Sequence, residues 1–223
     1  MNLNIPYMET DNKLLNDAYR IAAGDIVGNI VYYQNGLLTE EKPCMIAGLD
    51  YNTPWTRDTA INIWNALSIL SPEVSKNTLL AVLEEEEGNI YIGGQYWDSI
   101  IWMIGAREYC RFHKDDNFYR LAFKAGRNSV HRLEEDEFDE EDGLFRGPAV
   151  YGDGIAAYPD KYSKCPNQGS GILEWVDYPG NPVYPKGYGI PMKALSTNCV
   201  YFKAYEILAE MAHALGEPAK EFE

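Results

Sequence analysis

The feature that most constrains this chain is the recurrence of apolar residues at helical spacing over most of its length. In the segment 56–70, for example, Ala60, Ile63 and Leu67 fall on one helical face. Pro72 follows Ser71 as the first residue of a predicted helix, and Gly216 provides a stop signal for another. Helices are predicted over about 12–33, 56–70, 72–87, 97–113, 116–133 and 191–215. We therefore expect an all-α fold with a single domain over 1–223.

The segments between these helices are loops containing Tyr, Gly and Pro. The stretch 35–54 is predicted as a loop, and GNIYIGG at 88–94 predicts a short turn or hairpin. Two long loops, 134–162 and 163–190, stand out because loops of this length in a compact domain are usually functional or disordered. Their Tyr, Trp, Gly and Pro content favours a functional role.

Charge and aromatic content narrow the class of ligand. The 223 residues carry a net charge of −15, so a nucleic acid or an anionic membrane surface would be repelled. The 17 Tyr and 5 Trp suit a cleft that stacks flat rings on sugars, although a Tyr-rich core and rim is the alternative.

Metal and cofactor sites are not expected. The four cysteines (Cys44, Cys110, Cys165 and Cys199) form no CxxC pair or Cys/His cluster, and reduced thiols are expected, with two disulfides as the alternative. The acidic run 134–143 lacks the spacing of a calcium loop, so a solvated acidic face is expected.

No segment of the sequence predicts export or a membrane span. The N-terminus has neither a basic nor an apolar signal region, although an export signal removed from a mature protein would leave the same sequence. No apolar run is long enough to cross a membrane. We expect a soluble protein, and a cytoplasmic location is favoured over export.

Three segments combine an acidic residue with a Trp near the start of a predicted helix or in a loop. They are Trp55-Thr56-Arg57-Asp58, Trp97-Asp98 and Trp175-Val176-Asp177. An Asp at such a position can simply cap the helix, which is the structural alternative. If the loops converge on one rim of a helical ring, however, the three segments would line one cleft.

Such a cleft suits glycoside hydrolysis. The reaction needs one protonated carboxyl group as general acid and a second, ionised one. Apolar surroundings or a neighbouring negative charge raise the pKa of the acid. Asp177 lies beside Trp175 and three residues after Glu174, so it is the preferred acid, with Glu174 as its rival.

The same segments resemble a known family. YNTPWTRDTAINIWNALSIL (51–70), WDSIIWMIGAREYCRFHKDD (97–116) and EWVDYPGNPVYPKGYGIPMKALSTNCVYFKAYEILAEMAHALGE (174–217) follow one another in the order of corresponding motifs in glycoside hydrolases. The similarity is to the glucosidase domain of glycogen debranching enzymes and to glycoside hydrolase families 63, 37 and 15, which share the (α/α)6 toroid.

The resemblance implies an inverting hydrolase acting on a glucoside- or mannoside-type oligosaccharide. Asp177 would be the general acid, and the substrate-binding residues would be Trp55, Arg57, Asp58, Trp97, Asp98, Glu174 and Trp175. A complete toroid has about twice as many helices as are predicted here, and the motif of the catalytic base is not found. We therefore expect the N-terminal half of a barrel, completed by a second chain or a C-terminal half.

Two other functions remain open at this level. The first is a carbohydrate-binding or assembly protein without hydrolytic activity, which the unidentified base favours. The second is a sugar epimerase or lyase of the same fold. Epimerases of this fold use paired histidines, and His113, His131 and His213 instead have the spacing of surface or packing residues.

Overall fold

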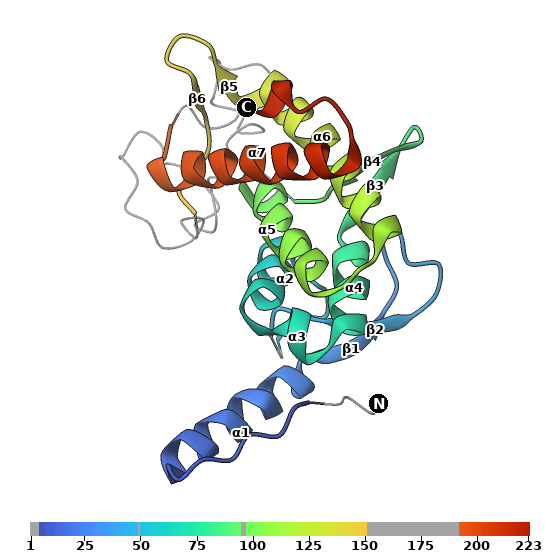
Figure 1. Ribbon diagram of the computed structural model, residues 1–223, viewed down its shortest axis with the longest axis vertical. Helices are drawn as coiled ribbons and strands as arrows, with labels where there is room; N and C mark the ends of the chain where they lie inside the picture. Colours follow the sequence, from blue (N-terminus) through green and yellow to red (C-terminus); the bar gives the residue numbers. More distant parts are fainter. Residues whose placement is uncertain (1–4, 49, 95–96, 151–191) are drawn as a thin grey trace.

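The computed structural model describes residues 5–48, 50–94, 97–150 and 192–223. Its helical body is organised around α5 (Trp97–Phe112), which contacts helices from both halves of the chain (Figure 1). These neighbours are α2 (Thr56–Asn62), α4 (Pro72–Ala81), α6 (Asp116–Glu137) and α7 (Leu195–Leu215). The predicted helices at 56–70, 97–113, 116–133 and 191–215 are confirmed within a few residues, except that α6 continues to Glu137.

The helix predicted at 56–70 contains a π-helical segment. α2 continues without a break into η1 (Ile63–Leu67), a π-helix, and then into α3 (Ser68–Leu70). Such widened turns occur in helices frequently at functional sites. Pro72 opens α4 at its first turn, as predicted.

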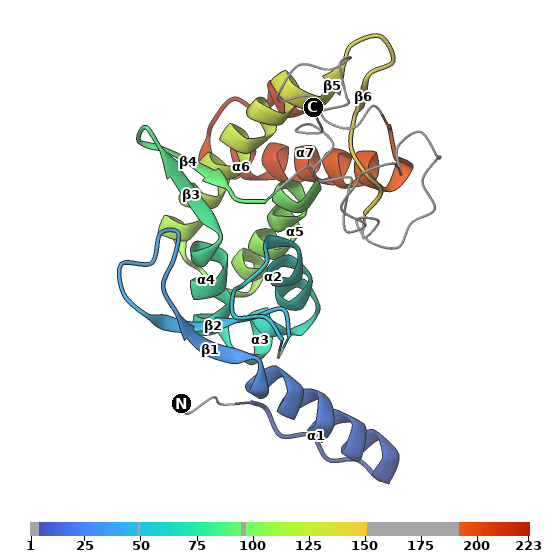
Figure 2. The same cartoon turned by 180° about the vertical axis from the view of Figure 1, so that it is seen from behind.

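α1 (Lys13–Gly28) projects away from the helical body (Figures 1 and 2). The Asn12 side chain caps it by accepting hydrogen bonds from the backbone N–H groups of Leu14 and Leu15, at 3.0 and 3.2 Å. All residues of α1 are described, and none of them is buried. The helix predicted at 12–33 is too long, because α1 ends at Gly28 and the chain then becomes extended.

Three two-stranded antiparallel sheets accompany the helices. They are β1 (Ile30–Tyr33) with β2 (Lys42–Met45), β3 (Leu83–Glu86) with β4 (Asn89–Ile92), and β5 (Phe138–Asp139) with β6 (Leu144–Phe145). β2 packs on α4 and β4 packs on α6 (Figure 2). The prediction of an all-α toroid is wrong, because the described residues form a mixed helix-and-strand structure.

The β3–β4 hairpin shows why the helical prediction failed there. The helix was predicted to continue to Glu87, whereas α4 ends at Ala81. Glu87 and Gly88 both have positive φ, 50° and 78°, which is the backbone of a tight hairpin turn. Leu83 and Ile92 form a buried pair at the base of the hairpin, and Glu84 to Glu86 extend into solvent.

The core forms where α5 meets its neighbours. Trp102 is fully buried, and its indole N–H donates to the Leu79 carbonyl at 3.3 Å. Gly105 lets α5 approach α2 closely, since a Cβ at this position would lie 2.8 Å from the Ala60 Cα. This contact sets the separation of the two helices that carry the candidate site.

The last long helix ends as the sequence predicts. Gly216 terminates α7 in the left-handed conformation with φ 72°, which confirms the predicted stop. Cys44, Cys110 and Cys199 are free thiols, while Cys165 lies outside the described residues. In the described ranges, no helix has both the length and the apolar character that a membrane crossing requires.

Candidate functional site

An ion pair between α2 and α5 forms the centre of the candidate site. The Arg57 Nη1 donates to both carboxylate oxygens of Asp98, at 3.0 and 2.9 Å. Both side chains are largely buried, with 16% and 13% of their surfaces exposed. Asp58 lies on the other side of the guanidinium, with its Oδ2 3.9 Å from the Arg57 Nε. The structure therefore brings together three polar residues that the sequence predicted for one site.

Two indole rings flank the same guanidinium. The Arg57 Cζ lies 5.6 Å from the ring centroid of Trp55 and 5.5 Å from that of Trp97, distances at which a cation is attracted to an aromatic face. Trp97 is only 2% exposed, so it supports Arg57 from the core. Trp55 is 40% exposed and offers aromatic surface to a ligand.

Tyr51 extends this aromatic surface. Its ring meets the Trp55 ring edge-on, with centroids 5.8 Å apart, and Tyr51 is 53% exposed. Tyr51 was not among the residues predicted for the site, although it opens the same motif as Trp55. An exposed corner of two aromatic rings beside a carboxylate is suited to a ligand with alternating apolar and hydroxyl faces.

Local backbone features hold the two helix starts together. The buried Thr56 hydroxyl donates to the Gly93 carbonyl at 2.9 Å, which ties the start of α2 to the segment before α5. Gly94 has φ 107°, and a Cβ there would lie 3.1 Å from the Asp98 Cβ. Thr56 and Gly94 thus position the site, and sequence reasoning missed both. The glycine pair before Trp97 was the available signal.

Helix capping is the alternative role for Asp58 and Asp98. The N-cap of α2 is Trp55, and no side-chain hydrogen bond caps this end. Asp58 and Asp98 lie in the first turns of α2 and α5, where the helix dipole favours a negative charge. Because both also contact Arg57, they have a role beyond completing helix ends.

The chemistry available here is that of a binding site with fixed charges. A guanidinium that donates two hydrogen bonds favours the ionised form of a carboxylate, which has no proton to donate. Asp98 is therefore suited to hold the guanidinium of Arg57 in place. The predicted acid Asp177, its rival Glu174 and the neighbouring Trp175 all lie outside the described residues.

The acidic run 134–143 has a structural role in addition to its exposed face. Lys193 donates to Asp139 and Asp142 at 2.7 and 2.6 Å, and Arg146 lies 3.3 Å from Asp139. The backbone N–H of Gly147 donates to the Met192 carbonyl at 2.7 Å. These contacts join residues 139–147 to residues 192–193. The segment that contains Asp177 lies between these two stretches in the sequence.

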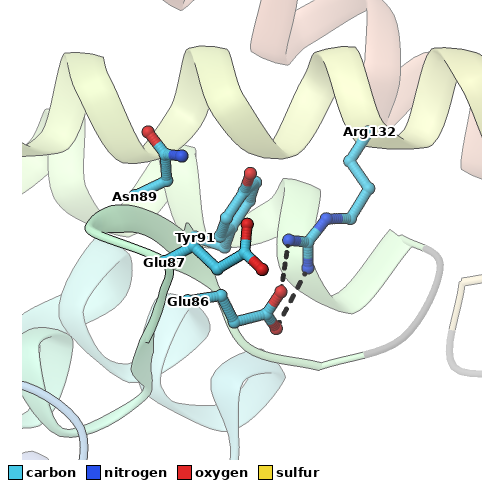
Figure 3. Close-up of a pocket in the computed structure, with 5 residues that line it drawn as sticks. All are labelled: Glu86, Glu87, Asn89, Tyr91 and Arg132. Atoms are coloured by element: carbon cyan, nitrogen blue, oxygen red, sulfur yellow. Dashed lines mark hydrogen bonds and ion pairs between the residues drawn. The ribbon is translucent and has the colours of Figure 1, made fainter.

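A polar hollow of about 540 Å³ lies between the β3–β4 hairpin and α6 (Figure 3). Arg132 stacks on the Tyr91 ring, with its Cζ 3.4 Å from the centroid, and donates two hydrogen bonds to Glu86 at 3.3 and 2.6 Å. Partial burial opposes the charge of Arg132, but hydrogen bonds to Glu86 and Tyr91 raise its pKa. These interactions attach the hairpin to α6, which explains the cluster structurally.

The three histidines occupy separate places. His113 contacts the Ser68 carbonyl at 2.7 Å, and His131 and His213 lie 3.6 and 3.0 Å from Glu221 and Glu223, respectively. Within the described part of the chain, no group of three His, Cys, Asp or Glu side chains is arranged to hold a metal ion.

Comparison with known proteins gave no match among family models, curated proteins or solved structures. The resemblance to glycoside hydrolases therefore rests on the sequence motifs alone.

Proposed function

We propose that this chain binds an oligosaccharide beside the Arg57–Asp98 pair and hydrolyses an α-glycosidic bond there by an inverting acid–base mechanism. The observation that carries the proposal is the grouping of Trp55, Arg57, Asp58, Trp97 and Asp98 at the paired starts of α2 and α5. The glucoside- or mannoside-type substrate comes from the motif resemblance.

In this proposal each residue of the site has a separate task. The exposed ring of Trp55 stacks on one face of a sugar, and Tyr51 borders it. Asp58, with 36% of its side chain exposed, accepts hydrogen bonds from sugar hydroxyls. Trp97 and Asp98 fix the guanidinium of Arg57 between them, so that it can donate to the same hydroxyls.

The hydrolytic step requires two further carboxyl groups. Asp177 donates a proton to the leaving oxygen, with Glu174 as the alternative donor. A carboxylate about 6.5–9.5 Å away activates the water that attacks the opposite face of the sugar. We infer that a second chain or a further part of the protein supplies this base.

One observation favours carbohydrate binding without hydrolysis as a second function. Both carboxylates at the described site, Asp58 and Asp98, lie within 3.9 Å of Arg57, an arrangement suited to ligand binding more than to proton donation. This function keeps the sugar-binding roles of Trp55 and Asp58 and needs neither Asp177 nor a base.

A panel of α-glucosides and α-mannosides distinguishes these functions. Calorimetry should show saturable binding that weakens at least tenfold in Trp55→Ala, because stacking anchors typically contribute more than about 1.4 kcal/mol. The control is Trp64→Ala, since Trp64 is 48% exposed on the same continuous helix but belongs to η1. Equal binding by both variants and the wild type would refute the site.

Release of reducing ends, followed by NMR of the first-formed anomer, tests the enzymatic part. In the complete enzyme, with the part that supplies the base present, hydrolysis with inversion is expected, and Asp177→Asn should lower its rate at least about a hundredfold. Binding without any release would support the non-catalytic function. Release that is unchanged in Asp177→Asn would refute Asp177 as the acid.

A further inference from the structure

A groove at the C-terminal end of the fold has an apolar floor. It lies between α7 and η3 (Lys220–Phe222), a 3₁₀-helix, and encloses about 580 Å³. Its floor consists of Phe202, Tyr205, Ala209 and Phe222. Phe202 is 68% exposed, so its ring presents apolar surface in the groove.

The rim of this groove is acidic. Glu206, Glu221 and Glu223 line it, and all three are exposed. Lys203, 3.0 Å from Glu206, is the lysine that pairs with the rim. His131 and His213 lie 3.6 and 3.0 Å from Glu221 and Glu223, and among the described residues three glutamates but no Lys or Arg line the groove itself. The chain as a whole has a net charge of −15, so its field attracts cations and repels anions.

Helical spacing on α7 limits the shape of an occupant. Phe202, Glu206 and Ala209 follow one another at intervals of four and three residues, so they form a ridge along one face of a 21-residue helix. A second helix packs against such a ridge with its own side chains at the same intervals.

We propose that this groove binds a helical segment of a partner protein that presents apolar residues at three- and four-residue spacing, flanked by Lys or Arg. The apolar residues cover the exposed ring of Phe202, and the basic residues pair with Glu206, Glu221 and Glu223. This interaction surface is separate from the Arg57–Asp98 site and does not depend on sugar binding.

The test uses a labelled, capped peptide of about 15 residues, long enough to form a helix on binding, with Leu at helical spacing and Lys elsewhere. Fluorescence anisotropy with the 223-residue chain should show saturable binding. A scrambled peptide of the same composition should bind at least tenfold more weakly, because it lacks the apolar stripe. Equal binding of the two peptides would overturn the proposal.

Matched variants locate the binding surface. Phe202→Asp should weaken binding of the Leu/Lys peptide at least about tenfold, as expected for a central apolar anchor. Phe112→Asp is the control, because Phe112 is 49% exposed on α5 and lies outside the groove. Circular dichroism checks that both variants remain folded. An equal effect of the two variants would overturn the proposal.

The charge component is tested by the triple variant Glu206→Gln, Glu221→Gln, Glu223→Gln. It should bind about tenfold more weakly at low salt, and the difference should shrink as NaCl screens the exposed charges. An unchanged affinity at low salt would refute the basic partner. Sedimentation of the protein alone completes the test, since a dimer that Phe202→Asp abolishes would assign the groove to a second copy instead.

Discussion

The contact between Gly105 and Ala60 gives a sharp test of how the site is built. Gly105 on α5 lies against the backbone of Ala60 on α2, and these two helices carry Asp98 and Arg57. In Gly105→Ala the new Cβ would lie 2.8 Å from the Ala60 Cα and 3.0 Å from its carbonyl oxygen. Both neighbours are backbone atoms, so the helices must separate to admit the methyl group.

Two opposing effects determine how far Gly105→Ala changes the free energy of unfolding. Overpacking of a well-packed contact costs about 1–3 kcal/mol. Replacing Gly by Ala inside a helix stabilises it by about 1 kcal/mol. Because the clash is with backbone, the upper part of the first range applies. The free energy of unfolding should therefore fall by about 1–2 kcal/mol.

Urea denaturation followed by circular dichroism and Trp fluorescence measures this difference. The control is Gly24→Ala on α1, where a new Cβ would meet nothing within 4 Å, so only the helix-propensity gain applies. A Gly105→Ala midpoint equal to or above that of the wild type would refute the reasoning. Ala60→Gly should not rescue the variant, because the contacts are with the Ala60 Cα and carbonyl oxygen.

Two further predictions concern ion pairs. Asp98→Asn should lower the free energy of unfolding by roughly 2 kcal/mol, because the largely buried Arg57 loses hydrogen bonds to a charged partner; an unchanged urea midpoint would contradict this. The second concerns Asp139, whose pKa the hydrogen bond from Lys193 lowers below its ordinary 3.8. A lowered folded-state pKa stabilises the protein above about pH 4, and this contribution disappears as the pH falls through the folded value. Lys193→Met should therefore reduce the loss of stability below pH 3.8 in acid titrations. An acid transition identical to that of the wild type would count against a stabilising role of the Asp139–Lys193 pair.

Local sequence signals predicted the helices that are long and strongly periodic. α6 combines an apolar stripe with polar residues on the other face, whereas α5 is buried on most sides, and both helices lie where expected. The end of α7 at Gly216 was equally predictable, because a left-handed cap favours glycine. These features depend on residues close together in the chain.

The turn or hairpin predicted at 88–94 is confirmed by β4, but the first strands of two hairpins were predicted as helix. Ile30 to Tyr33 and Leu83 to Glu86 each follow a helix directly, and short strands of four residues have little periodicity to separate them from a helical continuation. Each strand is stabilised by its partner, as in the pairing of Ile30 with Met45. That pairing joins residues well apart in the chain, so the sequence pattern around Ile30 alone does not reveal it.

The candidate site, too, was only partly predictable from the sequence. Its residue types were evident from the Trp, Arg and Asp motifs, because these side chains are characteristic of ligand binding in any fold. Only the tertiary structure decided that Arg57 pairs with Asp98, that Trp97 is buried while Trp55 is exposed, and that Tyr51 joins them. Those outcomes depend on the close approach of α2 and α5, which brings together residues some forty positions apart through packing at Gly105 and Ala60.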